Sequence, residues 1–147
     1  MAGIGDFDGD RQDDVFWRNR VNGANVIWLG ADRHRPQATT GVTNLAWEVV
    51  GIGEFDGDGR DDVVWRHAGS GANAIWSGAR HDQPIALRGI TDRQWKIVAV
   101  GDYDGNSRDD LLWRHMATGR NTVWLDADPT TQQAMPAVTD LDWQVVH

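Results

Sequence analysis

The sequence of 147 residues contains no cysteine, which excludes a disulfide framework and thiol chemistry. No apolar run approaches 18 residues and no basic-then-apolar leader follows Met1, so neither membrane insertion nor a signal peptide is expected within this sequence. Basic residues are in the minority, with 14 Lys and Arg against 22 Asp and Glu, and the formal net charge is -8. A nucleic-acid partner is therefore not expected, because the chain has no excess of cations to displace counterions from phosphate.

Tyrosine and phenylalanine are also scarce, with one and three residues, whereas tryptophan occurs nine times. Internal repetition explains this imbalance. The acidic segment 5–10 recurs at 53–58 and again at 101–106, each step being 48 residues without a gap. Of the 48 columns, 14 are identical in all three copies, which chance does not produce. The tryptophans occupy three of these columns: Trp17, Trp65 and Trp113; Trp28, Trp76 and Trp124; and Trp47, Trp95 and Trp143.

Each repeat has the features of four short strands. In the second copy, residues 49–53 form a short apolar run before the acidic segment, and residues 62–66 are β-branched and aromatic. A glycine turn at 69–71 leads to a further strand at 73–76, and residues 85–87 form a weaker fourth strand. No window shows sustained helical periodicity. Four strands in 48 residues predict one blade of a β-propeller.

The predicted fold is all-β: three propeller blades of four antiparallel strands, with repeats at about 3–50, 51–98 and 99–146 of a single unit, residues 1–147. A β-sandwich of irregular strands is the competing fold. Residues 1–3 align with 49–51, and residues 143–147 match the opening half of a first strand, so the first strand is divided between the two ends. This division predicts closure with further copies of the chain: two copies give six blades, which is favoured, and three give nine.

The acidic segment predicts a metal site. Counted from Asp6, carboxylates fall at loop positions 1, 3, 5, 8 and 9, namely Asp6, Asp8, Asp10, Asp13 and Asp14. Oxygen ligands without His or Cys select calcium over zinc or copper. An EF-hand would need Glu at position 12, where this chain has tryptophan. The three loops hold 14 of the 22 acidic residues, and such crowding favours a bound cation over a simple Asp-Gly turn.

The loop pattern Gly-Asp/Glu-Phe/Tyr-Asp-Gly-Asp/Asn-x-x-Asp-Asp resembles the FG-GAP or VCBS repeat of integrin α-chain propellers, bacterial secreted proteins and the fungal Psathyrella velutina-type lectin. The resemblance covers all three copies. It implies a secreted or extracellular-type propeller that holds up to three Ca²⁺ ions per chain in the loops between the first and second strands. The ligands it implies are side chains at positions 1, 3, 5 and 9 and the carbonyl at position 7: Asp6, Asp8, Asp10, Gln12 and Asp14; Glu54, Asp56, Asp58, Arg60 and Asp62; and Asp102, Asp104, Asn106, Arg108 and Asp110.

The three loops depart from this pattern in different ways. Position 6, which is normally glycine, is Gly59 in the second copy but Arg11 and Ser107 in the others, so these two loops are strained if the position needs a positive φ. Glu54 is one methylene longer than Asp, and Asn106 removes a charge. We therefore expect the second loop to fit best and the third to bind calcium most weakly, with dissociation constants of about 10⁻⁴ to 10⁻³ M.

An Arg, an Asn and a Trp are identical in every copy and are expected to converge at the rim opposite the acidic loop. Such a set suits sugar recognition, since an aromatic ring packs on a pyranose and amide or guanidinium groups bond its hydroxyls. The candidates are Arg18, Asn25, Trp47, Arg66, Asn73, Trp95, Arg114, Asn121 and Trp143. The resemblance to the fungal lectin implies N-acetylhexosamine-type glycans in weak sites between blades.

Packing is the competing interpretation: Trp65 and Trp76 would lie between blades, and Arg66 and Asn73 would bond backbone groups at the hairpin end. No acid–base pair or catalytic triad is evident, so an enzyme is not expected. The alternative to a lectin-like module is a structural or protein-interaction propeller with calcium but no sugar site. The divided first strand is also typical of an excised or engineered assembly fragment.

Overall fold

A computed structural model describes residues 2–146, which form three four-stranded antiparallel sheets. The first sheet contains β1 (Gly3–Gly5), β2 (Asp14–Arg18), β3 (Asn25–Trp28) and β4 (Pro36–Thr39). The second contains β5 (Trp47–Gly53), β6 (Asp62–His67), β7 (Asn73–Trp76) and β8 (Pro84–Leu87). The third contains β9 (Trp95–Gly101), β10 (Asp110–His115), β11 (Asn121–Trp124) and β12 (Gln132–Met135). A 3-10 turn follows the third strand of each sheet: η1 (Leu29–Ala31), η2 (Ser77–Ala79) and η3 (Leu125–Ala127).

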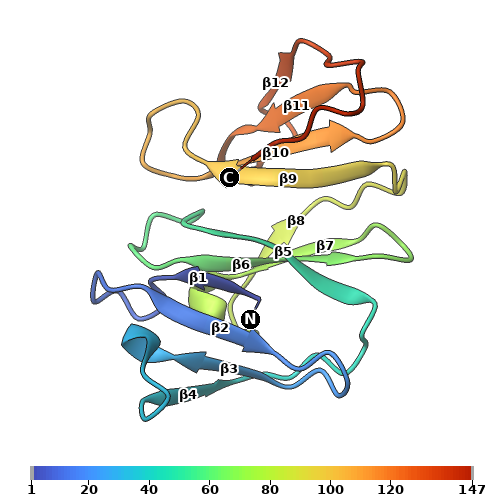
Figure 1. Ribbon diagram of the computed structural model, residues 1–147. Coiled ribbons are helices and arrows are strands. Elements are labelled where there is room, and N and C mark those ends of the chain that lie inside the picture. The colour runs from blue at the N-terminus through green and yellow to red at the C-terminus, as the bar shows by residue number, and fades with distance from the viewer. Residues whose placement is uncertain (1, 147) are drawn as a thin grey trace.

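Each sheet is one repeat, here called blade 1, 2 or 3, and its strands follow each other in a simple meander. Figure 1 shows the three blades stacked face to face, and β5 lies beside both β1 and β9. This arrangement confirms the all-β prediction and the three blade-like repeats. Residues 2–146 do not close into a ring, so closure stays a prediction. Residues 143–146 belong to no strand, and the two end residues of the proposed divided strand, Met1 and His147, lie outside the described residues.

The core lies between blades, because alternate residues of a strand point to opposite faces. On β6, Val63 and Trp65 face blade 1, whereas Val64 faces blade 3, and all three are at most 1% exposed. Trp65 packs edge-on against Phe16 with ring centroids 6.3 Å apart. Trp76 joins the same cluster. The packing interpretation of these two tryptophans is therefore confirmed.

The glycine of each strand-two to strand-three turn fixes the connection to the next blade. Gly71 has φ +75°, and an added Cβ would overlap the carbonyl of Ile90, whose amide donates to the Gly71 carbonyl at 2.9 Å. Gly23 and Gly119 repeat this arrangement. Only glycine combines positive φ with so close an approach of two backbones. The turn thus pins the segment that precedes the next blade's first strand.

The 3-10 turns were not predicted. Their alanines Ala31, Ala79 and Ala127 have φ of 57°, 59° and 56°, a conformation that local sequence preference disfavours for alanine. A tertiary hydrogen bond holds each turn in place, since Gly78 N, for example, donates to the buried Asp62 carboxylate at 2.9 Å. The identity of this alanine in all three copies is the signal that sequence reasoning could have used.

Candidate metal loops and interblade grooves

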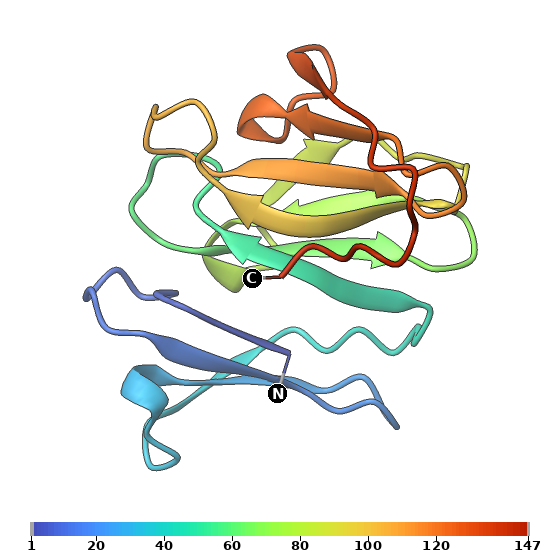
Figure 2. The same ribbon diagram turned by 45° about the horizontal axis from the view of Figure 1, so that its top comes forward.

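The three acidic loops lie at one edge of the blade stack, and the glycine turns lie at the opposite edge (Figures 1 and 2). Each acidic loop connects the first and second strands of its blade, as the sequence predicts. The loops are largely exposed, but each ends at a buried strand residue, Asp14, Asp62 or Asp110. The first two loops also begin at a buried residue, Gly5 and Gly53, whereas the third begins at the partly buried Gly101.

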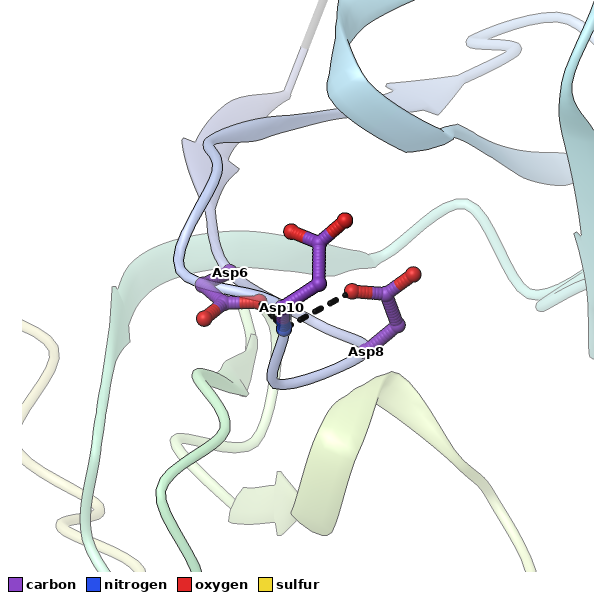
Figure 3. Close-up of side chains that lie close together, drawn as sticks. All are labelled: Asp6, Asp8 and Asp10. Carbon is purple, nitrogen blue, oxygen red and sulfur yellow. Dashed lines mark hydrogen bonds between the residues drawn. The ribbon is translucent and has the colours of Figure 1, made fainter.

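The structure brings the predicted side chains together at positions 1, 3 and 5 of the first two loops. Ligand oxygens lie within 4.8 Å of one another in the groups Asp6, Asp8 and Asp10; Glu54, Asp56 and Asp58; and Asp102, Asp104 and Asp110. In Figure 3 the carboxylates of Asp8 and Asp10 lie next to each other. Asp8 Oδ1 accepts from Asp10 N at 3.1 Å, which leaves its Oδ2 available. This turn geometry presents several oxygens at one point, as calcium requires.

Position 9 has a different environment. Asp14, Asp62 and Asp110 are 0% exposed, and of the three only Asp110 belongs to a metal group. Asp62 accepts from Phe55 N at 3.0 Å and from Gly78 N at 2.9 Å. Burial raises the pKa of Asp62 to about 7, although these two amides partly oppose the rise. Position 9 therefore ties the acidic loop to the 3-10 turn.

Position 7 and position 8 also have defined places. The amides of Gln12, Arg60 and Arg108 donate to the position-5 side chain at 2.8, 2.9 and 2.7 Å, so the predicted carbonyl ligands lie within the turn. At position 8, Asp61 and Asp109 reach the preceding blade, where their carboxylates accept from Asp6 N and Glu54 N at 2.8 and 2.9 Å. Sequence reasoning gave position 8 no role, although its aspartate is identical in every copy.

Position 6 takes positive φ in all three loops, at 67° for Arg11, 81° for Gly59 and 71° for Ser107. The expected strain at the two non-glycine residues is therefore present.

We predict that Ser107→Gly raises the free energy of unfolding by about 0.5–1 kcal/mol, because relief of left-handed strain exceeds the added entropy of the unfolded chain. Urea unfolding measures it. The reciprocal change Gly59→Ser, where an added Cβ meets no atom within 4 Å, should lower stability by a similar amount. An unchanged midpoint in both variants would contradict this account.

The identical Arg and Asn residues bond within the protein. Arg66 is 4% exposed; its Nη1 donates to Gly71 O and Asn73 Oδ1 at 3.1 and 2.8 Å, and its Nη2 to Ile90 O and Trp95 O at 3.0 and 3.2 Å. Asn73 Nδ2 donates to a further backbone carbonyl at 2.7 Å. Burial lowers the pKa of Arg66. This pair fixes the segment between β8 and β9, and Arg18 with Asn25 and Arg114 with Asn121 do the same in blades 1 and 3.

A groove follows each blade boundary. Between blades 1 and 2 it measures about 500 Å³, and its lining includes Thr43, Asn44, Trp47, Trp65, Trp76 and His81. Between blades 2 and 3 it measures about 370 Å³, and its lining includes Thr91, Asp92, Trp95, Thr122, Trp124 and Gln132. Trp47 and Trp95 are half-buried, and each packs edge-on against the histidine paired with it on the second strand of the same blade, His67 or His115, with ring centroids 5.2 Å apart. Trp143, the third member of this column, is 67% exposed and lines neither groove.

Comparison with family models, with curated proteins and with solved structures finds no match for this chain. No helix among residues 2–146 has the length and apolar character needed to cross a membrane.

Proposed function

We propose that this chain is a non-catalytic, extracellular-type β-propeller module whose acidic loops hold calcium and whose interblade grooves bind carbohydrate. The observation that supports it most is the repetition of one groove at both blade boundaries, each lined by a half-buried tryptophan of the same column. Repeated weak sites on one rigid frame suit a ligand that is itself repetitive, such as a glycan chain, because multivalency multiplies weak affinities.

Calcium is the cation that the loops fit. Their donors are carboxylate, amide and backbone oxygens, and crowded carboxylates repel one another unless a cation intervenes. Asp6, Asp8, Asp10 and their equivalents would hold the ion, which would neutralise charge and tie the first strand of the blade to the second. Three ions per chain would bring the formal net charge from -8 to -2. Affinities of about 10⁻⁴ to 10⁻³ M match extracellular calcium concentrations.

The groove supplies the chemistry of a sugar site. In the boundary between blades 1 and 2, the Trp47 ring offers an apolar surface for a pyranose, and Thr43 and Asn44 offer hydrogen-bond donors and acceptors. The same column positions in the second groove are Trp95, Thr91 and Asp92. Because the donors of Arg66 and Asn73 already bond protein acceptors, we assign them to holding the groove and assign ligand contact to the tryptophan column.

Titration with N-acetylglucosamine tests this proposal. At about -0.3 kcal/mol per non-hydrogen atom, a sugar of about 15 such atoms binds with a Kd of about 0.5 mM. Isothermal titration calorimetry in calcium should show this weak binding. Trp47→Ala combined with Trp95→Ala should remove binding at these two grooves, because each loses the tryptophan assigned to ligand contact.

Trp47→Phe combined with Trp95→Phe is the matched control, since it keeps an aromatic ring in each groove and should retain most of the affinity. Thermal melting of each variant verifies the fold. Absence of binding by the parent protein to hexosamines and to a broad glycan array would overturn the carbohydrate proposal. The chain would then be a structural or protein-interaction propeller.

A further inference from the structure

Two neighbouring blades join through a fixed set of contacts near the acidic loops, and the set occurs twice within the chain. The carboxylate of Asp61 lies so close to Gly5 that an added Cβ would be 2.6 Å from Oδ2, and Asp109 approaches Gly53 in the same way. Each aspartate also donates its own amide to the preceding loop, Asp61 N to Asp6 O at 2.7 Å, for example. The glycine column thus forms a seat for the aspartate of the next blade.

A second set of contacts lies farther along the same interface. The guanidinium of Arg18 in blade 1 lies 4.9 Å from the ring centroid of Trp65 in blade 2, and Arg66 lies 5.1 Å from that of Trp113 in blade 3. Each interface therefore joins an arginine and a glycine seat on one blade to a tryptophan and an aspartate on the next.

Blade 3 has the arginine and the glycine of this interface, but within residues 2–146 no further blade supplies the matching tryptophan and aspartate. No atom lies within 4 Å of a Cβ built on Gly101, although the equivalent positions Gly5 and Gly53 are crowded. Within residues 2–146 neither Asp102 N nor Asp102 O has the interblade bond of its equivalents. Tyr103 is 47% exposed, whereas its equivalents Phe7 and Phe55 are 2% and 4% exposed.

Blade 1 carries the complementary half. Asp13 is exposed, whereas its equivalents Asp61 and Asp109 are half-buried. Trp17 is only partly buried, although its equivalent Trp65 is 1% exposed. The missing contacts of blade 3 are those that blade 1 could supply, but the two blades lie at opposite ends of the stack (Figure 1).

We infer that blade 1 of a second copy docks on blade 3 of the first, and blade 3 of the second on blade 1 of the first, giving a six-blade ring. Asp13 of the partner subunit occupies the Gly101 seat and bonds Asp102 N, and Trp17 of the partner subunit lies beneath Arg114. Two identical interfaces related by a two-fold axis satisfy both open faces. Six is the only multiple of three within the common range of about four to eight blades.

The ring also completes a third groove, a consequence that rests on the proposed carbohydrate function. Trp17, Val26 and Trp28 form one wall of an open hollow on blade 1, in the columns that blades 2 and 3 contribute to the complete grooves. The opposite wall, the segment 136–143, belongs to blade 3. A sugar should therefore bind with three sites per chain in the dimer and two in a monomer.

Light scattering coupled to size exclusion, in calcium and across a dilution series, tests the ring without any sugar. The expected mass is twice the 16.4 kDa of one chain. A monomer or a trimer would overturn the inference, whatever the outcome of the sugar titrations. A dimer that binds no sugar would leave the inference standing and contradict the proposed function instead.

Gly101→Val tests the seat, because the added side chain meets open space within one chain but fills the position of the partner's Asp13. This variant should be a monomer with the parent's circular dichroism spectrum. Val21→Ala is the control: Val21 is 86% exposed, and its equivalents Gly69 and Ala117 stay exposed beside a neighbouring blade, so this variant should remain a dimer. A dimeric Gly101→Val protein would overturn the assigned contacts.

Discussion

Removal of calcium is expected to lower the free energy of unfolding by about 4–8 kcal/mol. A ligand at about 10 to 100 times its dissociation constant stabilises the native state by about 1.4–2.7 kcal/mol per site, and each chain offers three loops. Chelation also restores the repulsion among the carboxylates of each loop. Thermal and urea unfolding in about 10 mM calcium and in excess chelator, at one protein concentration, measure the difference. Identical midpoints in the two conditions would contradict calcium binding.

The pH dependence gives a second measure of the same site. Since burial raises the pKa of Asp62 to about 7, the native state in chelator holds a proton that the unfolded chain releases near pH 4. Stability in chelator should therefore fall as pH rises from about 4 to about 7. A Ca²⁺ ion held by the neighbouring Glu54, Asp56 and Asp58 favours the ionised form of Asp62, so this fall should be smaller in calcium. Asp56→Asn combined with Asp58→Asn should remove about one third of the calcium effect, whereas Asp82→Asn, an exposed acid outside the loops, should leave it unchanged.

Arg66→Met is expected to lower the free energy of unfolding by about 3–5 kcal/mol, because it leaves buried acceptors without a donor. The variant keeps an apolar stem but loses four hydrogen bonds, two of them to the backbone of Ile90 and Trp95. It also loses the contact of the guanidinium with the Trp113 ring at 5.1 Å. Urea unfolding in calcium measures the loss.

Two further variants test whether the lost hydrogen bonds cause the destabilisation expected for Arg66→Met. Arg80→Met is the control, since Arg80 is exposed and its ion pair with Asp82 is long, at 3.8 Å, so its stability should stay within about 0.5 kcal/mol of the parent. Arg66→Lys should recover only part of the loss. The single ammonium group of lysine cannot donate to all the acceptors that the two Nη atoms of the planar guanidinium group reach. The expected loss in free energy of unfolding is about 3–5 kcal/mol. A loss of less than about 1 kcal/mol would show that these hydrogen bonds do not stabilise the fold.

The sequence predicted all three blades, but it predicted the roles of only some of the site residues. The acidic pattern predicted which oxygens gather, and positions 1, 3 and 5 of the first two loops do so, because alternate side chains of a tight turn point to one side. It did not predict that Asp62 would use both oxygens for backbone amides, since one of these, Gly78 N, lies 16 residues away. Nor did it distinguish the packing and sugar-binding interpretations of Arg66, whose acceptors lie up to 29 residues along the chain.

The sequence by itself determined the three blades: a gapless 48-residue repeat, strand-type alternation and a glycine turn in each copy leave one meander per repeat. These are local properties that each copy carries alone. Only the tertiary structure decided what equivalent residues do, because that depends on whether a neighbouring blade covers them. Trp65 is 1% exposed, its equivalent Trp17 is only partly buried, and Gly101 is open where Gly5 is crowded. The columns are identical, but burial is a property of the pair of blades that meet.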